Sequence, residues 1–380
     1  MGEGYSAPSV ANGRLFFFDR HNDRARLTCL DSKSGDELWR SEYPTTYEDM
    51  YQYSGGPRTS PVVDGERVFV YGVDGFLRAH EVSSGDLIWQ VDTAGRFGVI
   101  QNFFGVGSTP IVEGDLLITV VGGSPPDSPR IHSGEVQGAG SGIVAFDKSS
   151  GEVRYSVSDE LAAYSSPVVH TLGDRRWGFA FTRSGLIGFE PTGGEVDFEF
   201  PWRSRKLESV NAATPIVFDG LVLITESYGP GCAVVRPRPG GFEVVRADPP
   251  GRGKSLEAHW STPIYLDGSV YGSSGESSGN SDLRCIEPLS GKVLWSEKMP
   301  RSTLLYVDDH FVVLTERGTM RLIRASSQGF QPVTELELGD SLGYPSWNGP
   351  ILSHGLLYVR GSKKLIALEL IPPTRSATRN

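Results

Sequence analysis

Short runs of alternating apolar and polar residues recur along the whole chain, and most copies begin with the same phrase. The phrase is Ser/Thr-Pro, two or three apolar residues and then an acidic residue and Gly, as at 60–65, 109–114, 214–220 and 262–268. Looser copies contain Pro8, Pro167 and Pro350. A period of about 50 residues predicts a supersecondary unit that is stable only when it stacks against its copies.

The remainder of each copy predicts the structure of the unit. In one copy, alternating apolar runs at 67–72, 75–82 and 87–91 are separated by residues rich in Gly, Asp and Ser. Such runs with such turns are typical of antiparallel strands joined by hairpins. The unit is therefore predicted to be a four-stranded blade, and the chain an all-β propeller.

Counting the copies gives eight blades. Seven carry the Pro phrase, and one unit at 303–323 has the strand pattern without its Pro. Seven blades is the alternative, if a weak unit is irregular. A single propeller domain is expected over residues 1–371, followed by a polar tail at 372–380. The last unit ends after two hairpin strands at 356–361 and 365–370, so it is expected to lack its outer strand.

One position near the end of each blade holds a large ring in five of the copies. Trp39, Trp89 and Trp295 follow a Ser-Gly turn at the same distance, and Tyr155 and Phe198 take the same place in two other copies. A ring at a fixed repeat position is expected to pack between blades. The three cysteines, Cys29, Cys232 and Cys285, are isolated in sequence and are expected to be buried small hydrophobic residues.

The segments 27–39, 143–153 and 283–295 share an apolar strand, an acidic residue, a Ser-Gly turn and in two cases the final Trp. They resemble the tryptophan-docking motif of the pyrroloquinoline-quinone (PQQ) propeller repeat. The resemblance covers about residues 5 to 370 and implies the propeller fold. The superfamily includes PQQ- and calcium-dependent alcohol dehydrogenases, the cofactor-free propeller lipoprotein of the outer-membrane barrel-assembly machine, and uncharacterised planctomycete-type bacterial proteins. The chain is most similar to the last group.

The resemblance does not carry the cofactor with it. The dehydrogenases have adjacent cysteines under the quinone and long inserts with an acidic base and calcium ligands, whereas this chain has no Cys-Cys pair. We therefore expect no cofactor and no metal, and PQQ is suggested by the family name only. The resemblance to envelope proteins implies a periplasmic or extracellular location.

The net charge and the hydropathy of the chain argue against two classes of partner, nucleic acid and the membrane interior. A formal net charge of -10 argues against nucleic acid. No stretch is long and apolar enough to span a bilayer. No signal peptide is visible, because the first residues lead directly into the first blade. Since nothing before Tyr5 supplies the missing outer strand, we expect the sequence to begin inside a longer exported protein.

Insertions between blades point to a functional face. The segments 43–57, 96–105, 202–211 and 252–260 each connect the outer strand of one blade to the inner strand of the next, so they are expected on one rim. They carry aromatic and polar residues suited to a ligand site. The alternative is that these loops pack on each other and plug the centre. The loop 122–141 is expected on the opposite rim.

The candidate ligand-binding residues belong to these loops. Arg58, Asn102, Asn211 and His259 precede inner-strand prolines, so they are expected to converge near the axis. Arg58 suits an anion, the two Asn side chains supply hydrogen bonds, and His259 is the proton carrier of the set. The adjoining loops add the wall of the site, which comprises Glu48, Tyr51, Trp202 and Glu257.

No catalytic motif is convincing. The G-x-S-x-G matches at 275–279 and 339–343 lack the following helix that a nucleophile elbow needs. The seven His include no pair with metal-ligand spacing. We therefore expect a non-enzymatic binding or scaffolding propeller with a protein or small-molecule ligand at the mouth. The alternative is a small-molecule hydrolase, lyase or quinone-linked oxidoreductase acting there.

Overall fold

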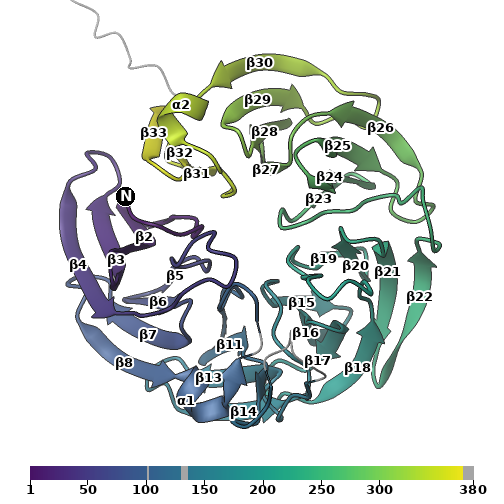
Figure 1. Cartoon of the computed structure of the whole chain (residues 1–380). Coiled ribbons are helices and arrows are strands. Elements are labelled where there is room, and N and C mark those ends of the chain that lie inside the picture. The colour runs from purple at the N-terminus through teal and green to yellow at the C-terminus, as the bar shows by residue number, and fades with distance from the viewer. Residues whose placement is uncertain (101, 130–135, 371–380) are drawn as a thin grey trace, which may run out of the picture.

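The strands of the computed structural model form a closed ring of eight antiparallel sheets around one axis (Figure 1). The structure describes residues 1–100, 102–129 and 136–370. The predicted tail at 372–380 lies outside these residues. Eight blades confirm the prediction, and the alternative of seven is wrong.

The first four blades, from inner to outer strand, are β1 (Ser9–Ala11), β2 (Arg14–His21), β3 (Arg24–Asp31) and β4 (Glu37–Pro44); β5 (Val62–Asp64), β6 (Arg67–Tyr71), β7 (Phe76–Glu81) and β8 (Leu87–Asp92); β10 (Ile111–Glu113), β11 (Leu116–Val120), β13 (Ile143–Asp147) and β14 (Val153–Val157); and β15 (Val168–Leu172), β16 (Arg175–Phe181), β17 (Gly185–Phe189) and β18 (Val196–Pro201).

The next four are β19 (Ile216–Phe218), β20 (Leu221–Glu226), β21 (Gly231–Arg238) and β22 (Gly241–Ala247); β23 (Ile264–Leu266), β24 (Ser269–Ser277), β25 (Asn280–Ile286) and β26 (Val293–Lys298); β27 (Ser302–Val307), β28 (His310–Thr315), β29 (Thr319–Arg324) and β30 (Pro332–Glu337); and β31 (Ile351–Ser353), β32 (Leu356–Arg360) and β33 (Leu365–Glu369). In the described part of the chain the eighth blade therefore has three strands, as the sequence predicts.

The Ser/Thr of the repeated phrase links neighbouring inner strands. The backbone N–H of Ser60 donates to Thr109 Oγ1 at 3.1 Å, and the N–H of Thr109 donates to Ser166 Oγ at 3.1 Å. The N–H of Thr214 donates to Thr262 Oγ1 at the same distance. The hydroxyl thus satisfies a backbone donor of the preceding blade. This explains why a hydroxyl residue precedes the Pro in the repeat.

The rings at the repeated position lie between blades, as predicted. Nε1 of Trp39 donates to the carbonyl of Val82 at 2.9 Å, and Nε1 of Trp89 donates to the carbonyl of Lys148 at 3.1 Å. A register shift recurs in the pairing of the third and fourth strands of all seven four-stranded blades. The shift is a β-bulge that increases the local twist. The three cysteines are buried in β3, β21 and β25, as expected.

Side chains of the last blade close the ring against the first. The hydroxyl of Tyr358 donates to the carbonyl of Ser32 at 2.6 Å. The fully buried guanidinium of Arg360 donates to the carbonyls of Ser6 and Phe18, the latter at 3.2 Å. These contacts join β32 to the first blade, so closure does not depend on a fourth strand alone.

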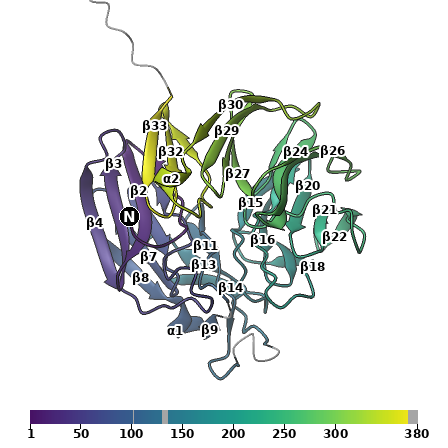
Figure 2. The same cartoon turned by 45° about the horizontal axis from the view of Figure 1, so that its top comes forward.

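The described residues of the loop 122–141, namely 122–129 and 136–141, lie on the same rim as the interblade loops, so the predicted placement of this loop on the opposite rim is wrong. Its strand β12 (Gly123–Ser124) pairs with β9 (Val99–Ile100), which follows the short helix α1 (Thr93–Phe97) in the loop between blades two and three. Figure 2 shows α1 and β9 together at one end of the ring. The reason is that successive antiparallel strands reverse direction, so turns alternate between the two edges of a blade. The turn between the second and third strands therefore lies at the edge where the first strand begins.

We call this edge the mouth rim. It consists of the loops that enter each inner strand and the turns between the second and third strands. A second short helix, α2 (Gly339–Leu342), lies on it between blades seven and eight. Across the ranges that the structure describes, no helix is long and apolar enough to cross a membrane.

Candidate functional site at the mouth rim

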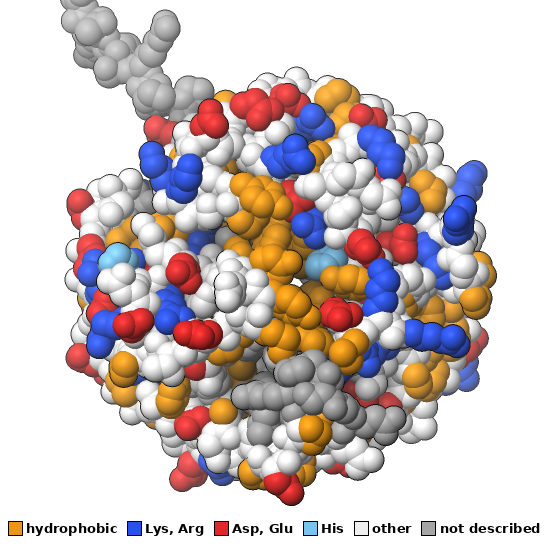
Figure 3. All heavy atoms as spheres, viewed as in Figure 1, with side chains coloured by type: hydrophobic (Ala, Val, Ile, Leu, Met, Phe, Trp, Pro, Cys, Tyr) orange, Lys and Arg blue, Asp and Glu red, His pale blue; other side chains and the backbone are white. Residues whose placement is uncertain are grey.

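Aromatic side chains gather at the centre of the mouth rim. Tyr51 lies 5.6 Å from Phe104 and 6.3 Å from Phe103 between ring centroids, and Tyr53 lies 5.9 Å from Phe104. Phe104 in turn lies 5.7 Å from Tyr164. Figure 3 views this rim and shows hydrophobic side chains gathered across the centre of the face. We call these five residues the aromatic group.

The loops that carry the aromatic group also pack on each other. Phe103, Leu161 and Val210 are buried in one cluster, with Tyr164 and Tyr228 packed against it. These residues come from the loops before blades three, four and five and from a turn of blade five. The alternative of mutually packed loops is thus realised in this part of the rim. Tyr51 and Tyr53 nevertheless remain 42% and 63% exposed.

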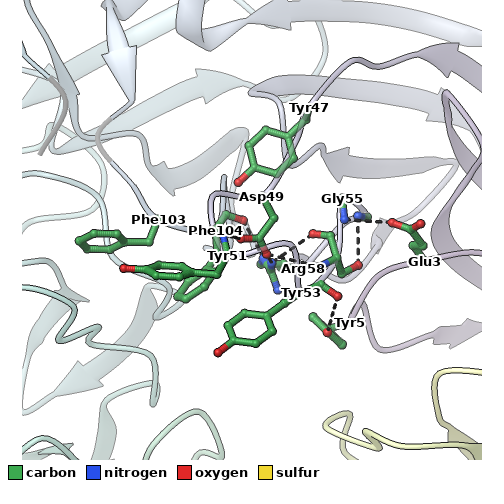
Figure 4. A network of polar contacts seen from close by, with 12 residues as sticks. Glu3, Tyr5, Tyr47, Asp49, Tyr51, Tyr53, Gly55, Arg58, Phe103 and Phe104 are labelled. Atoms are coloured by element: carbon green, nitrogen blue, oxygen red, sulfur yellow. Dashed lines mark hydrogen bonds and ion pairs between the residues drawn. The ribbon is translucent and has the colours of Figure 1, made fainter. Parts of the chain in front are cut away.

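The structure places Arg58 inside this packing rather than free in the mouth (Figure 4). Its Nη2 lies 2.9 Å from Asp49 Oδ2, and its Nε donates to the carbonyl of Phe104 at 2.6 Å. The guanidinium carbon lies 5.1 Å from the ring centroid of Tyr5 and 5.2 Å from that of Phe104. The carboxylate of Asp49, which also accepts the N–H of Tyr51 at 2.8 Å, is therefore the anion that Arg58 holds here.

Asn102 and Asn211 hold backbone and aromatic groups in place. Asn102 Oδ1 accepts the hydroxyl of Tyr164, and its buried Nδ2 has no hydrogen-bond partner in the structure. It borders a cavity of about 530 Å³. Buried Asn211 donates from Nδ2 to the carbonyls of Thr182 at 2.8 Å and Trp202 at 3.3 Å. The two Asn residues do flank the aromatic group, but they mainly fix its loops.

His259 belongs to a second aromatic set on the rim. Its Nε2 lies 2.8 Å from the hydroxyl of Tyr228, and its ring lies 5.3 Å from Trp260. Burial, followed by the charge of Arg301, lowers the pKa of His259 to about 3. The ring is therefore neutral near pH 7, so this environment does not suit the predicted proton carrier.

An ion pair supports this second set. Arg301 Nη2 lies 2.7 Å from Glu316 Oε2, and its guanidinium carbon lies 4.3 Å from the ring centroid of Trp260. Nε1 of Trp347 donates to the same Glu316 oxygen at 2.9 Å. Trp347 also lies 4.6 Å from Tyr5 between centroids. Tyr5 thereby connects the second set to Arg58 and the aromatic group.

The remaining predicted wall residues are dispersed. Glu48 is exposed and makes no hydrogen bond or ion pair within the described residues. Trp202 packs on Phe200, with centroids 5.7 Å apart, and donates from Nε1 to the carbonyl of Gly231 at 3.2 Å. Glu257 is partly buried, and burial raises its pKa. Of this wall, Tyr51 alone is a member of the aromatic group.

Sequence analysis missed three charged residues beside the predicted ones. Glu226 is buried at the end of β20, where burial raises its pKa to about 7. Arg203 directly follows Trp202, and Arg183 lies in the turn between β16 and β17. Arg203 stood inside an insertion that the sequence already marked. Arg183 lies in the turn between the second and third strands of its blade, and such turns lie on the mouth rim.

The described residues contain no cluster of metal-ligating side chains. No group of three or more of their His, Cys, Asp and Glu side chains could hold a metal ion. The three cysteines lie in different blades, so none of them is adjacent to another. These residues do not fit the quinone and calcium site that the family name suggests. A polar cavity of about 760 Å³ does open on the rim, lined in part by Ser278, Arg317, Tyr344 and Lys363.

The ring of blades with inter-blade docking rings defines a PQQ-repeat type of propeller. The profile of the family described as outer membrane protein assembly factor BamB matches residues 23–297. The chain therefore belongs to this family. A search of curated proteins finds no match.

Solved structures share the fold at low sequence identity. BamB from Moraxella catarrhalis is 13% identical, with 95% of this chain and 92% of that chain covered and a TM-score of 0.64. The quinohemoprotein alcohol dehydrogenase from Comamonas testosteroni is also 13% identical, with 94% and 70% covered and a TM-score of 0.65. The computationally designed Ika8 protein is 11% identical, with 98% and 97% covered and a TM-score of 0.60. At these identities the likeness concerns the fold.

Proposed function

We propose that this chain is a non-enzymatic scaffold propeller of the cell envelope that binds a protein partner at its mouth rim. The observation that carries the proposal is the distribution of exposed apolar side chains. Of the sixteen exposed large apolar side chains of the described residues, several are spread along outer strands, but five stand on the interblade loops of this one rim, with exposed fractions from 41% to 63%, namely Met50, Tyr51, Tyr53, Leu207 and Tyr344. Exposed apolar side chains gathered on one face are typical of an interaction site.

The chemistry of the rim supports a protein partner. Tyr, Trp and Arg dominate the energetics of protein interfaces because they combine large contact area with polar groups. Here the aromatic residues stand on a ring of blades. Arg58 and Arg301 pack against Phe104 and Trp260 and are themselves held by a backbone carbonyl and by Glu316. A preorganised surface loses little conformational entropy when it binds. The description of the family as an assembly factor agrees with a scaffold and with an exported location.

Site-specific photocrosslinking tests the proposal. A photoreactive amino acid replaces Tyr53 on the mouth rim or Leu289, which is 55% exposed in the turn between β25 and β26 on the opposite edge. We expect a discrete protein adduct from position 53 in envelope preparations and none of the same mass from position 289. The partner identified in this way must then bind the purified propeller. Equal adducts from both positions, or a purified partner that does not bind, would contradict the proposal.

The 760 Å³ cavity keeps a small-molecule ligand as the second candidate. It lies on the same rim between blades six, seven and eight, and its lining combines polar and charged groups with Tyr344. Cavities of this size hold ligands of metabolite dimensions. A ligand that raises the melting temperature of wild type, but not of a Tyr344→Ala variant, would favour this candidate over the protein partner.

A further inference from the structure

Two arginines meet at one carbonyl oxygen beside the aromatic group. Arg183 Nη2 donates to the carbonyl of Leu207 at 2.9 Å, and Arg203 Nη2 donates to the same oxygen at 3.0 Å. The guanidinium of Arg183 also lies 5.4 Å from the ring centroid of Phe103. The pair therefore borders the surface that we propose as the docking site.

Neither arginine forms a direct ion pair with a carboxylate of the described residues. No ion pair within 4.0 Å joins Arg183 or Arg203 to an acidic residue in the ranges that the structure describes. Arg183 is only 6% exposed, and Nε of Arg203 is buried without a hydrogen-bond acceptor. Buried arginines are ordinarily paired, because an uncompensated charge in the interior is costly.

The nearest carboxylates are already committed to other donors. Glu160 Oε2 accepts the hydroxyl of Thr182 and the N–H of Ser184, both at 2.9 Å. Glu226 accepts the hydroxyl of Ser209 at 2.9 Å and the N–H of Tyr228 at 3.0 Å. Because the pKa of Glu226 is raised to about 7, it carries only part of a negative charge at neutral pH.

The arginines themselves remain charged. Burial lowers the pKa of Arg183 to about 10, with the neighbouring charge of Arg203 as the second cause. Burial also lowers the pKa of Arg203. An arginine guanidinium is not deprotonated in proteins, so both groups carry a positive charge at neutral pH. Glu160 acts electrostatically on both arginines and Glu226 on Arg203, but among the described residues no carboxylate lies within 4.0 Å of either guanidinium.

The geometry points to a carboxylate-binding subsite: we propose that Arg183 and Arg203 bind a carboxylate of the protein partner while an adjacent apolar side chain of that partner packs on the aromatic group. The inference rests on the proposed function, since it names the chemistry that the partner offers. Guanidinium groups bind carboxylates through short charge-assisted hydrogen bonds. Asn211 is a positioning residue for the pair, because its Nδ2 holds the carbonyls of Thr182 and Trp202.

Short peptides test the subsite without the partner. The probes are acetyl-Phe-Glu-Phe-amide, the matched peptide with Gln in place of Glu, and acetyl-Phe-Gln-Phe with a free carboxylate, each titrated against the whole chain by ligand-observed NMR. We expect a preference of about tenfold for one carboxylate peptide over the Gln amide, equal to about 1.4 kcal/mol. The stronger of the two carboxylate peptides identifies a side chain or a chain terminus as the source.

Variants test whether the two arginines cause the preference for carboxylate peptides. Arg183→Gln and Arg203→Gln should each reduce the preference to less than about twofold, whereas Arg203→Lys should keep part of it. The matched control is Arg205→Gln, because Arg205 is exposed on the same loop and should leave the preference unchanged. If Arg183→Gln does not fold, the partly exposed Arg203 decides the question alone.

Two results would overturn the subsite. One is a wild-type chain that binds the Gln amide as well as both carboxylate peptides. The other is a preference that survives in folded Arg203→Gln. Neither result affects crosslinking from position 53, so failure of the subsite and failure of the docking surface are distinguishable. A peptide preference without any crosslinked partner would instead contradict the proposed function.

Discussion

The indole of Trp39 in the first blade lies directly on Gly85 in the second. A Cβ atom at Gly85 would lie 2.4 Å from Cε3 of Trp39, and Gly85 has a φ of 79°. Trp89 has the same relationship to Gly151, where the corresponding distance is 2.7 Å. The Ser-Gly turn of one blade is thus the platform on which the ring of the preceding blade packs.

A Gly85→Ala substitution should therefore lower the free energy of unfolding through both steric overlap and backbone strain. Gly35 is a matched control, because it has a φ of 76° in the equivalent turn and a Cβ added there would meet no atom within 4 Å. We expect about 1 kcal/mol of strain at Gly35 and an additional ~1–3 kcal/mol from overpacking at Gly85. Denaturant unfolding measures the difference. Equal losses at the two positions would show that the ring moves aside freely.

Arg58→Ala should destabilise the fold. The change leaves the buried carboxylate of Asp49 without its cation and removes two aromatic contacts, so a loss of about 3 kcal/mol is expected. The control is the double variant Arg58→Ala/Asp49→Asn, which should recover part of the loss because no charge is left unpaired. An Arg58→Ala chain that unfolds at the wild-type denaturant concentration would contradict this structural role.

The pH dependence of stability should report the burial of His259. Its folded pKa of about 3 lies below the ordinary value of 6.5, so the unfolded chain binds more protons between these values. The contribution of the neutral ring is complete above about pH 6.5 and is lost as the pH falls toward 3, by at most about 1.4 kcal/mol per pH unit.

The measurement is the difference between wild type and His259→Gln across this range, because differences remove the contributions of other groups. The free energy of unfolding of wild type minus that of His259→Gln should decrease as the pH falls from about 6.5 toward 3. His21→Gln, at an exposed position, is the control for the substitution itself. A pH-independent difference for His259→Gln would mean that the ring is not held in its neutral form.

Glu226 should act in the opposite direction. Burial raises its folded pKa from 4.5 to about 7, so the folded chain binds more protons between these values and loses stability as the pH rises through them. Glu226→Gln removes this loss. Relative to wild type, the variant should therefore be more stable at pH 8 than at pH 5, by up to ~3 kcal/mol in the difference. The same free-energy difference at both pH values would show that the carboxyl group is not desolvated.

Titration with PQQ and calcium should give no saturable change in absorbance or melting temperature. The chain has no adjacent cysteines to lie under the quinone, and its described acidic residues form no metal cluster. A quinoprotein dehydrogenase titrated in parallel shows that the quinone and calcium stocks are competent. A saturable response at micromolar concentration would contradict the expectation.

The repeat made the fold predictable, because local spacing determines which strands pair. The Pro phrase leads into inner strands such as Val62–Asp64, and the ring of Trp39 docks on the next blade, as its position predicts. The loop 122–141 was misplaced because its rim depends on the direction of strands rather than on its own residues. The site was harder to predict for a different reason. Tertiary contacts decide whether Arg58 pairs with Asp49 or with a ligand, and they also decide which group Arg183 contacts. The spacing of residues along the chain does not predict these contacts.

The affinity of the purified partner for a Tyr51→Ala/Tyr53→Ala double variant tests the central claim most directly. Both side chains are exposed members of the aromatic group, so their loss should leave the melting temperature nearly unchanged. We predict that the dissociation constant rises at least about tenfold, as for truncated aromatic anchors at other interfaces. The control is Leu289→Ala/Tyr306→Ala, which changes exposed residues outside the aromatic group and should bind as wild type does. A double variant at positions 51 and 53 that binds the partner with wild-type affinity would contradict docking at the mouth rim.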